Sequence, residues 1–265
     1  MKSKGNYSKK TPIRKGVKQN IDKDAQPTNV SVRLNKYIAD AGICSRREAD
    51  KLIESGKIII NGKVVTQLGT KVIQGDVVVY NGKTLRSEKL KYVLLNKPKG
   101  FITTSDDPQN RRTVMNLVEK ACSERIYSVG RLDRNTTGLL LFTNDGELTT
   151  RLTHPKHGVK KLYHVVLDKP LSKNDMLRII EGIELEDGKI SPDKINWVTD
   201  EVDKRHVGIE LHSGKNRIVR RIFEKLGYEV VKLDRVIFAG LTKKDLPRGK
   251  WRFLEEKEVN ILKMI

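Results

Sequence analysis

One carboxylate stands in the segment whose residue types and spacing are most suggestive of chemistry. Asp133 lies in GRLDRNTTGLLLFTNDG, where a polar loop that opens at Gly130 leads directly into the apolar run 139–142. The apolar run predicts a buried strand, and a loop fixed to a rigid strand gives a catalytic side chain the support that it needs. By residue type alone, however, an aspartate beside Asn135 and Thr136 is more often a turn or cap residue.

Arginines gather on one predicted helix, residues 215–226. Its apolar face would carry Val219, Ile222, Phe223 and Leu226, and its polar face Arg217, Arg220, Arg221 and Glu224. Packing of the apolar face would leave the arginines free to reach a site. For Arg217 and Arg221, contact with phosphate is favoured over a part in chemistry.

A second pair of arginines follows a predicted helix cap. Ser45-Arg46-Arg47-Glu48 has the spacing of a capping box, so Arg46 and Arg47 fall in the first turn of a helix. Cations there face the positive end of the helix dipole, which costs about 0.3–1 kcal/mol. A bound phosphate would remove the conflict, because backbone N–H groups and both guanidiniums would face one anion. A solvated pair of charges is the alternative.

The overall charge predicts a polyanionic partner. The 265 residues include 53 Lys and Arg against 33 Asp and Glu, a formal net charge of +20, and nucleic acid is the first candidate. An anionic membrane would attract the same charge, but no apolar stretch approaches the roughly 18 residues of a spanning helix. The N-terminus also lacks the apolar run of a secretory signal, so a cytoplasmic protein is expected.

The sequence offers no ligand set for a metal. Its two cysteines, Cys44 and Cys122, lie far apart in the sequence and belong to no CxxC or HxxxH motif. A structural zinc site needs about four clustered ligands. His154 and His157 could share one face, but no third ligand supports them. Phosphate-binding glycine motifs are missing as well, so neither a metal nor an organic cofactor is expected.

The elements that must position these residues divide the chain in two. Residues 1–30 are basic and nearly without apolar side chains, which predicts a disordered arm that either grips RNA or only solubilises. Residues 31–80 show two short helices, a hairpin at Asn61-Gly62 and a further strand over 75–80. The polar stretch 81–91 is the expected linker, and residues 92–265 form the second domain.

The second domain is predicted to be α+β. Its strands are expected at 92–97, 139–143, 163–167, 207–211 and 229–233, and its helices at about 147–153, 173–181, 215–226 and 256–264. Several consecutive strands lack a helical crossover, so a mixed, mainly antiparallel sheet is expected rather than a doubly wound one.

The run RLNKYIADAGICSRREADKLIESGKIIINGKVV resembles an S4 domain, an RNA-binding module found in ribosomal protein S4 and in several RNA-modifying enzymes. The resemblance covers about residues 32–80. It implies that Arg33, Lys36, Arg46 and Arg47 face RNA.

The segment GRLDRNTTGLLLFTNDGEL resembles the catalytic signature of the RsuA/RluB family of pseudouridine synthases. Supporting matches are LNKPKGFITTSDDP, KKLYHVVL, LHSGKNRIVRRIFEKLGYEVVKLDRV and LPRGKWRFL. The resemblance therefore extends from about Val32 to the carboxyl end of the chain. It implies a cofactor-free enzyme that isomerises uridine in ribosomal RNA after turning the base out of the RNA.

The resemblance also implies a role for individual residues. Asp133 would be the nucleophile or general base, and Tyr163 would stack on the target uracil, although an ordinary strand aromatic is its alternative. Arg220 would pair with Asp133, Val219 would pack against the base, and Arg131 would help to hold the RNA. Relatives often have Ile or Leu in the place of Val219.

The target implied by the resemblance is the large-subunit 23S rRNA, free or within a ribosome-assembly intermediate, modified by a monomer. SDDPQNRRTVMNLV and GLLLFTNDGEL look closer to that branch of the family. A synthase for the small-subunit 16S rRNA is one alternative. A non-catalytic S4-type RNA-binding assembly factor is another, although such a factor would not require the set Asp133, Tyr163 and Arg220.

Overall fold

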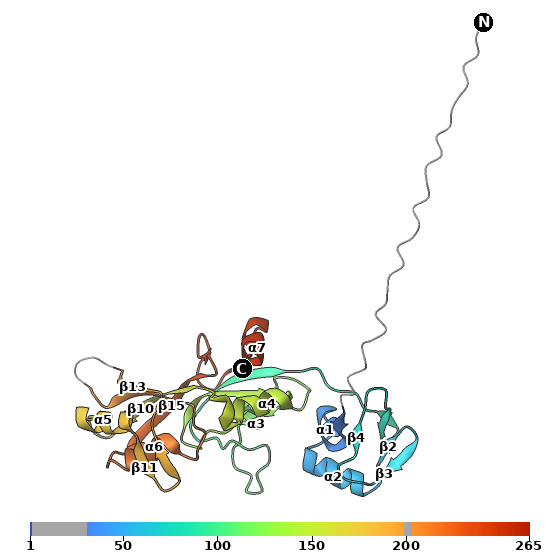
Figure 1. Cartoon of the computed structure of the whole chain (residues 1–265), viewed down its shortest axis with the longest axis horizontal. Coiled ribbons are helices and arrows are strands. Elements are labelled where there is room, and N and C mark those ends of the chain that lie inside the picture. Colours follow the sequence, from blue (N-terminus) through green and yellow to red (C-terminus); the bar gives the residue numbers. More distant parts are fainter. Residues whose placement is uncertain (2–30, 199–202) are drawn as a thin grey trace.

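The computed structural model describes residue 1, residues 31–198 and residues 203–265. The arm predicted over residues 1–30 lies outside the described residues, apart from Met1. Figure 1 shows a small unit and a larger unit, joined by an extended segment. Within the described part of the chain, no helix is long and apolar enough to cross a membrane.

The small unit packs two helices against short strands. Helices α1 (Leu34–Asp40) and α2 (Arg46–Glu54) precede a four-stranded sheet of order β3-β2-β5-β6, formed by Lys63–Val65, Ile58–Ile60, Val78–Tyr80 and Lys83–Thr84. Strands β1 (Val32–Arg33) and β4 (Lys71–Val72) form a separate pair. The core comprises Leu34, Ile38, Ala49, Ile53, Ile58, Val72, Val78 and Leu85. The capping box is confirmed, because Ser45 accepts from the Glu48 N–H and Glu48 from the Ser45 N–H.

The predicted linker, residues 81–91, is partly wrong. Asn81 and Gly82 both have positive φ and form a two-residue hairpin turn that brings β6 onto β5. Leu85 then enters the core of the small unit. The polar pair Asn81-Gly82 was interpreted as part of a linker, but Asn-Gly is also the pair that a two-residue hairpin turn favours. The connecting segment is therefore only 86–91.

The larger unit is built on one mixed sheet, of order β13-β14-β10-β15-β9-β7-β17. These strands are Lys194–Trp197, His206–Leu211, Lys161–Leu167, Val230–Phe238, Thr137–Thr143, Tyr92–Lys97 and Trp251–Phe253. Strands β9 and β15 run parallel, and the other neighbours in this order run antiparallel. The predicted α+β class with a mainly antiparallel sheet is confirmed.

Shorter strands that the sequence pattern missed complete this unit. Strand β8 (Tyr127–Ser128) pairs with β9, and β16 (Leu241–Thr242) pairs with β15. Strands β11 (Ile183–Leu185) and β12 (Gly188–Ile190) form a separate hairpin. Two or three residues are too few to show an alternating pattern, so only tertiary pairing reveals such strands.

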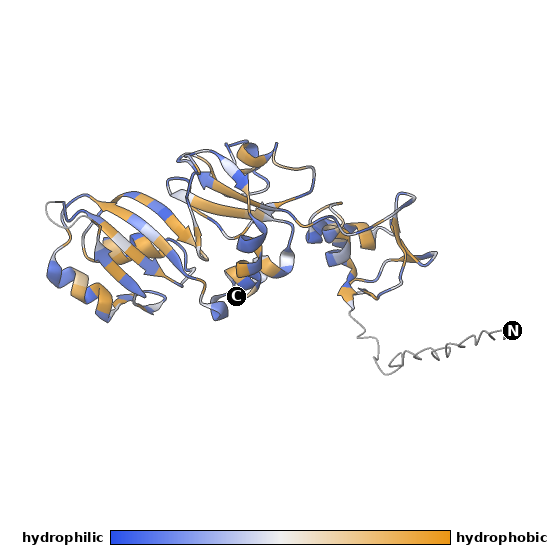
Figure 2. Cartoon of the chain, turned by 90° about the horizontal axis from the view of Figure 1, so that it is seen from above, coloured by the Kyte–Doolittle hydropathy of each residue, from blue (hydrophilic) through white to orange (hydrophobic). Residues whose placement is uncertain are grey.

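Helices cover both faces of the sheet (Figure 2). They are α3 (Met115–Val118), α4 (Gly146–Thr153), α5 (Lys173–Glu181), α6 (Ile218–Glu224) and α7 (Glu256–Lys263), with a 3-10 turn at Pro155–His157. Alternate residues of β9 enter different cores: Leu139 and Leu141 join the cluster of α4 and α7, whereas Leu140 and Phe142 join that of α3. Strand β9 is thus buried on both faces, which makes it a rigid support for the loop before it.

The predicted helix 215–226 is shorter than expected. Helix α6 begins at Ile218, and Arg217 precedes it in the left-handed conformation with φ 47°. Arg217 therefore does not lie on the polar face of the helix, as the periodicity suggested.

Gly138 permits the close approach of β9 to β15. It pairs with Arg235 across the parallel strands and has φ +110°. A Cβ atom here would lie 2.2 Å from the Arg235 carbonyl oxygen and 2.5 Å from its backbone nitrogen. The start of β9 can therefore reach β15 only without a side chain at this position.

We expect Gly138→Ala to lower the free energy of unfolding by roughly 3 kcal/mol, from backbone strain and overpacking together. Gly240→Ala is the matched control, since Gly240 also has positive φ (+81°) but no atom within 4 Å of its Cβ position. The control should lose about 1 kcal/mol. Urea denaturation of both variants measures the difference, and equal losses would contradict the close-packing argument.

Candidate active site

Five of the predicted site residues line one pocket of about 430 Å³ in the larger unit. They are Arg131, Asp133, Tyr163, Arg217 and Val219. The pocket lies between the loop before β9, the strands β10 and β15, and the segment that opens α6. Arg220, Arg221 and the four cations of the small unit are not among the residues that line it.

The loop that carries Asp133 is fixed by its backbone. The Thr136 N–H donates to the Asp133 carbonyl at 3.0 Å, and the Gly100 N–H donates to the Arg134 carbonyl at 2.8 Å. The Thr103 hydroxyl donates to the Leu132 carbonyl at 2.7 Å. These bonds hold the backbone while the Asp133 side chain remains 37% exposed and available to a ligand.

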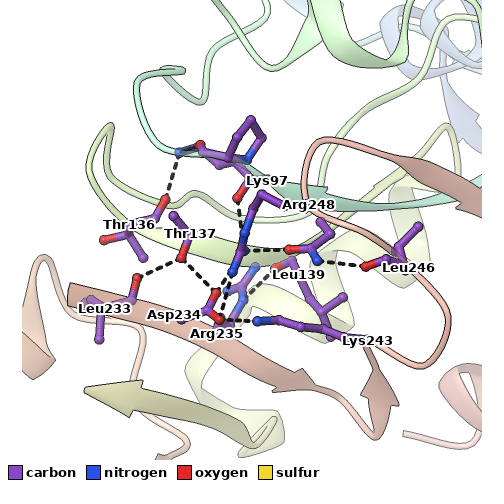
Figure 3. A network of polar contacts seen from close by, with 12 residues as sticks. Lys97, Thr136, Thr137, Leu139, Leu233, Asp234, Arg235, Lys243, Leu246 and Arg248 are labelled. Atoms are coloured by element: carbon purple, nitrogen blue, oxygen red, sulfur yellow. Dashed lines mark hydrogen bonds and ion pairs between the residues drawn. The ribbon is translucent and has the colours of Figure 1, made fainter. Parts of the chain in front are cut away.

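The ammonium of Lys97 is fully buried beneath this loop and donates to its carbonyls; Figure 3 shows the bond to Thr136. Its Nζ donates to the carbonyls of Thr136 at 2.8 Å, Asp133 at 3.1 Å and Arg134 at 3.4 Å, and also to Pro98 at 3.2 Å. Burial lowers the Lys97 pKa to about 8, with Asp133 opposing the shift and Arg248 adding to it. Lys97 stands in the LNKPKG motif, but no role was predicted for it.

A second polar network ties the far end of the loop to β15 (Figure 3). The Asp234 carboxylate accepts from the Thr137 hydroxyl at 2.8 Å, from both terminal nitrogens of Arg248 at 3.0 Å, and from Lys243. Burial acts to raise the Asp234 pKa, but hydrogen bonds from Arg248, Lys243 and Thr137 lower it overall. Both ends of the Asp133 loop are therefore anchored by charged groups.

The cation beside Asp133 is Arg217, not Arg220. Arg217 Nη1 lies 3.8 Å from Asp133 Oδ2. Arg220 instead donates to the Val230 carbonyl at 2.7 Å, and burial and Arg217 lower its pKa while Asp133 opposes them. The predicted pairing of Arg220 with Asp133 is thus not present. The left-handed conformation of Arg217, which periodicity does not reveal, brings its side chain to the pocket.

Arg221 is also engaged within the protein. Its terminal nitrogens donate to the Asp187 carboxylate at 2.5 and 3.0 Å. The phosphate contact predicted for Arg221 would therefore have to compete with an existing ion pair.

The remaining walls combine an aromatic ring, aliphatic side chains and cations. Tyr163 lies on β10 between Ile209 of β14 and Arg235 of β15. Val219 and Leu233 supply aliphatic surface. Lys161 and Lys215 also line the pocket, although the sequence pattern did not single them out; burial and Arg235 lower the Lys161 pKa to about 8.

The chain resembles known RNA-modifying enzymes over most of its length. The model of the RNA pseudouridylate synthase family matches residues 91–225, and that of the S4 domain matches residues 32–78. The ribosomal large subunit pseudouridine synthase B of Bacillus subtilis is 44% identical, with 88% of this chain and 96% of the relative covered. The chain belongs to the pseudouridine synthase family.

Two further relatives agree with this assignment. The dual-specificity RNA pseudouridine synthase RluF of Escherichia coli K12 is 36% identical, with 89% of this chain and 80% of the relative covered. A crystal structure of a pseudouridylate synthase is 31% identical, with a TM-score of 0.64 and 87% and 99% of the two chains covered. The synthase is therefore an isomerase built on the expected fold.

In the S4 unit of the synthase, three of the four predicted RNA-facing cations are free of partners. The side chains of Arg33, Arg46 and Arg47 are exposed and make no hydrogen bond or ion pair with another described residue, although Arg46 Nη2 comes within 3.5 Å of the Cβ position at Gly146 of the larger unit. Lys36 instead pairs with Asp40 at 2.9 Å and with Glu147 of the larger unit at 3.5 Å. The structure thus gives Lys36 a contact between the two units.

Over residues 31–198 and 203–265, no group of three or more His, Cys, Asp or Glu side chains is placed to hold a metal ion. Cys44 and Cys122 are both free thiols. The rings of His154 and His157 are nearly perpendicular, with an interplanar angle of 81° and centroids 6.3 Å apart.

The buried ammonium predicts an alkaline pH dependence of stability. Above about pH 8 the folded synthase releases the Lys97 proton, whereas the unfolded chain keeps it until near pH 10.5. The unfolded state then binds more protons, so stability rises with pH across this window. Relative to Lys97→Met, the free energy of unfolding of the parent should rise by up to about 3 kcal/mol.

Urea denaturation of both proteins from about pH 7 to about pH 10 measures this gap, with the pH window taken from the Lys97 shift. The pKa of Lys161 is lowered in the parent and in the variant alike, so its contribution to the pH dependence of the free energy of unfolding cancels in the difference. A gap that stays constant over this range would contradict the lowered pKa.

Proposed function

We propose that this synthase isomerises a uridine of ribosomal RNA, in the 23S rRNA of the large subunit, with Asp133 as the catalytic carboxylate. The observation that carries the proposal is the pocket in which Asp133, Tyr163 and a rim of cations come together. The large-subunit target is supported by the name of the Bacillus subtilis relative, a large-subunit synthase.

The reaction needs little beyond these side chains. The N1–C1′ bond of uridine breaks, the uracil turns while still bound, and C5 joins C1′. C5 then releases its proton to solvent and N1 takes one up, so no group is donated and no net oxidation occurs. The Asp133 carboxylate serves either by attacking C1′ or by removing a ribose proton. Both routes require an exposed carboxylate on a backbone that does not move, which the bonds around Lys97 supply.

The nucleotide must leave the RNA stack to enter the pocket. Turning out a base costs a few kcal/mol, which stacking and phosphate contacts offset. Tyr163 provides the ring for stacking, and Val219 and Leu233 pack against the base. Arg131 and Arg217 flank Asp133 and hold the adjoining phosphates, and Arg217 in addition balances the Asp133 charge.

The S4 unit supplies RNA-binding affinity away from the reacting base. Arg46 and Arg47 stand at the amino end of α2, where an exposed pair of cations beside the helix amino end favours a phosphate. Arg33 adds a third free cation on the same unit. We further propose that the synthase acts as a cytoplasmic monomer and meets its rRNA free or in an assembly intermediate.

We expect Asp133→Asn to abolish pseudouridine formation while RNA affinity stays within a few-fold of the parent. Asn keeps the shape but can neither attack C1′ nor accept a proton, so kcat should fall by at least ~10³-fold, or ~4 kcal/mol. Affinity should survive because phosphate contacts supply most of it. Tritium release from [5-³H]uridine-labelled rRNA, measured beside filter binding, separates the two effects.

The matched control is Asp187→Asn. Asp187 has a similar side-chain exposure, 44% against 37%, and also faces an arginine, but it lies outside the pocket. The control should retain near-parental tritium release. Near-normal release by Asp133→Asn would reject the catalytic assignment.

Replacing Arg46 and Arg47 together by Ala should raise the apparent KM for structured rRNA roughly tenfold and leave kcat nearly unchanged. The two cations bind phosphate equally in the ground state and in the transition state, so their loss weakens binding without slowing the chemical step. The slope of log affinity against log salt should fall by about two, one for each lost phosphate contact. Lys63→Ala with Lys71→Ala, which removes equal charge from exposed positions of the same unit, should change KM far less.

A further inference from the structure

A second buried cation lies directly beside Tyr163. Arg235 is only 3% exposed, and the two residues face each other across β10 and β15. Its Nε donates to the Leu139 carbonyl at 2.8 Å (Figure 3), and its guanidinium lies over the Phe238 ring at 4.5 Å from the centroid. Its Nη2 is buried without a hydrogen-bond partner in the described part of the chain.

Packing alone does not explain this arginine. Arg235 has no carboxylate at ion-pair distance among the described residues, and a buried cation without a counter-charge is costly. Burial lowers the Arg235 pKa, and the Tyr163 side chain acts against that shift. An apolar side chain would fill the same space at lower cost, so the cation points to a task at the pocket that it lines.

The task follows from the hydrogen-bonding capacity of the two groups. A guanidinium has five N–H donors and no acceptor, whereas a phenol hydroxyl both donates and accepts. Against Arg235, the Tyr163 oxygen can therefore only accept. Its own hydrogen is then left to face the pocket.

On the basis of the proposed function, we propose that Arg235 is a positioning residue for Tyr163. Its free N–H holds the phenol oxygen as an acceptor, so that the hydroxyl hydrogen is directed at an acceptor oxygen of the flipped nucleotide. The position of Arg235 is itself tied to the catalytic strand, because Gly138 is its neighbour and the Leu139 carbonyl accepts from its Nε. Arg235 would thereby fix the position of the Tyr163 hydroxyl relative to the Asp133 loop.

A double-mutant cycle tests this dependence with the full-length synthase and an rRNA fragment under single turnover. Tyr163→Phe keeps the ring and removes the hydroxyl, and Arg235→Met keeps the length and removes the donors. Each change should lower the rate constant by roughly 10- to 100-fold, the range for a hydrogen bond to a charged group, with RNA affinity unchanged. The double variant should be no slower than Tyr163→Phe by more than about threefold.

Losses that multiply in the double variant would overturn the proposal, as would an Arg235→Met variant with the parental rate. Arg235→Lys keeps the charge and one donor direction, so it should recover part of the rate. If Arg235→Met does not fold, the cycle is run with Arg235→Lys, and the same non-additivity is required.

Two controls isolate the contribution of Arg235. Arg252→Met breaks the partly buried pair of Arg252 with Glu258, at 2.7 Å and away from the pocket, and should keep the parental rate. A parent protein that releases no tritium from rRNA would reject the proposed function and this inference with it. An active parent whose double variant shows multiplied losses would reject the inference alone.

Discussion

The burial of the Lys97 ammonium beneath the Asp133 loop is the interaction on which the geometry of the pocket depends. A charged group fully removed from water must find other dipoles, and here they are the carbonyls of Asp133, Arg134, Thr136 and Pro98. Those acceptors belong to the backbone, so their bonds leave the Asp133 carboxylate itself free. The loop backbone is thus held by hydrogen bonds, while the Asp133 side chain stays 37% exposed. Strand β9 follows this loop directly and is buried on both faces, so the loop is attached to the core of the larger unit.

Charge in this synthase serves two different purposes according to its burial. Exposed cations such as Arg33, Arg46 and Arg47 contribute to a solvated field that salt screens. Lys97 and Arg235 are removed from water and Lys161 is partly buried. All three donate to backbone carbonyls at short range, where salt has much less effect. Asp234 connects the Asp133 loop to β15. Its carboxylate accepts a hydrogen bond from Thr137, and it is the neighbour of Arg235 on that strand.

Much of the fold could be predicted from local patterns. Helices α4, α5 and α7 begin and end within a residue or so of their expected bounds, since each has an apolar face and a cap or turn nearby. The capping box of α2 and the Asn61-Gly62 hairpin were also foreseen, because they are short-range interactions encoded by adjacent residues. Strands β8, β16 and β17 were missed, since two or three residues acquire their structure only by pairing with distant strands.

By itself, the sequence determined the motif around Asp133, the basic character of both units and the α+β class, because residue type, spacing and family resemblance depend only on neighbours along the chain. Tertiary structure alone decided which cation meets Asp133: periodicity placed Arg217 and Arg220 together on one helix face, whereas the left-handed backbone at Arg217 separates them. It alone decided that Lys36 spans the two units and that Lys97 and Arg235 are buried. Burial and contact are properties of segments brought together across 96 residues, as Leu139 and Arg235 are. A one-dimensional pattern does not carry that information, because a charged side chain has the same local signature whether it faces water or a carbonyl.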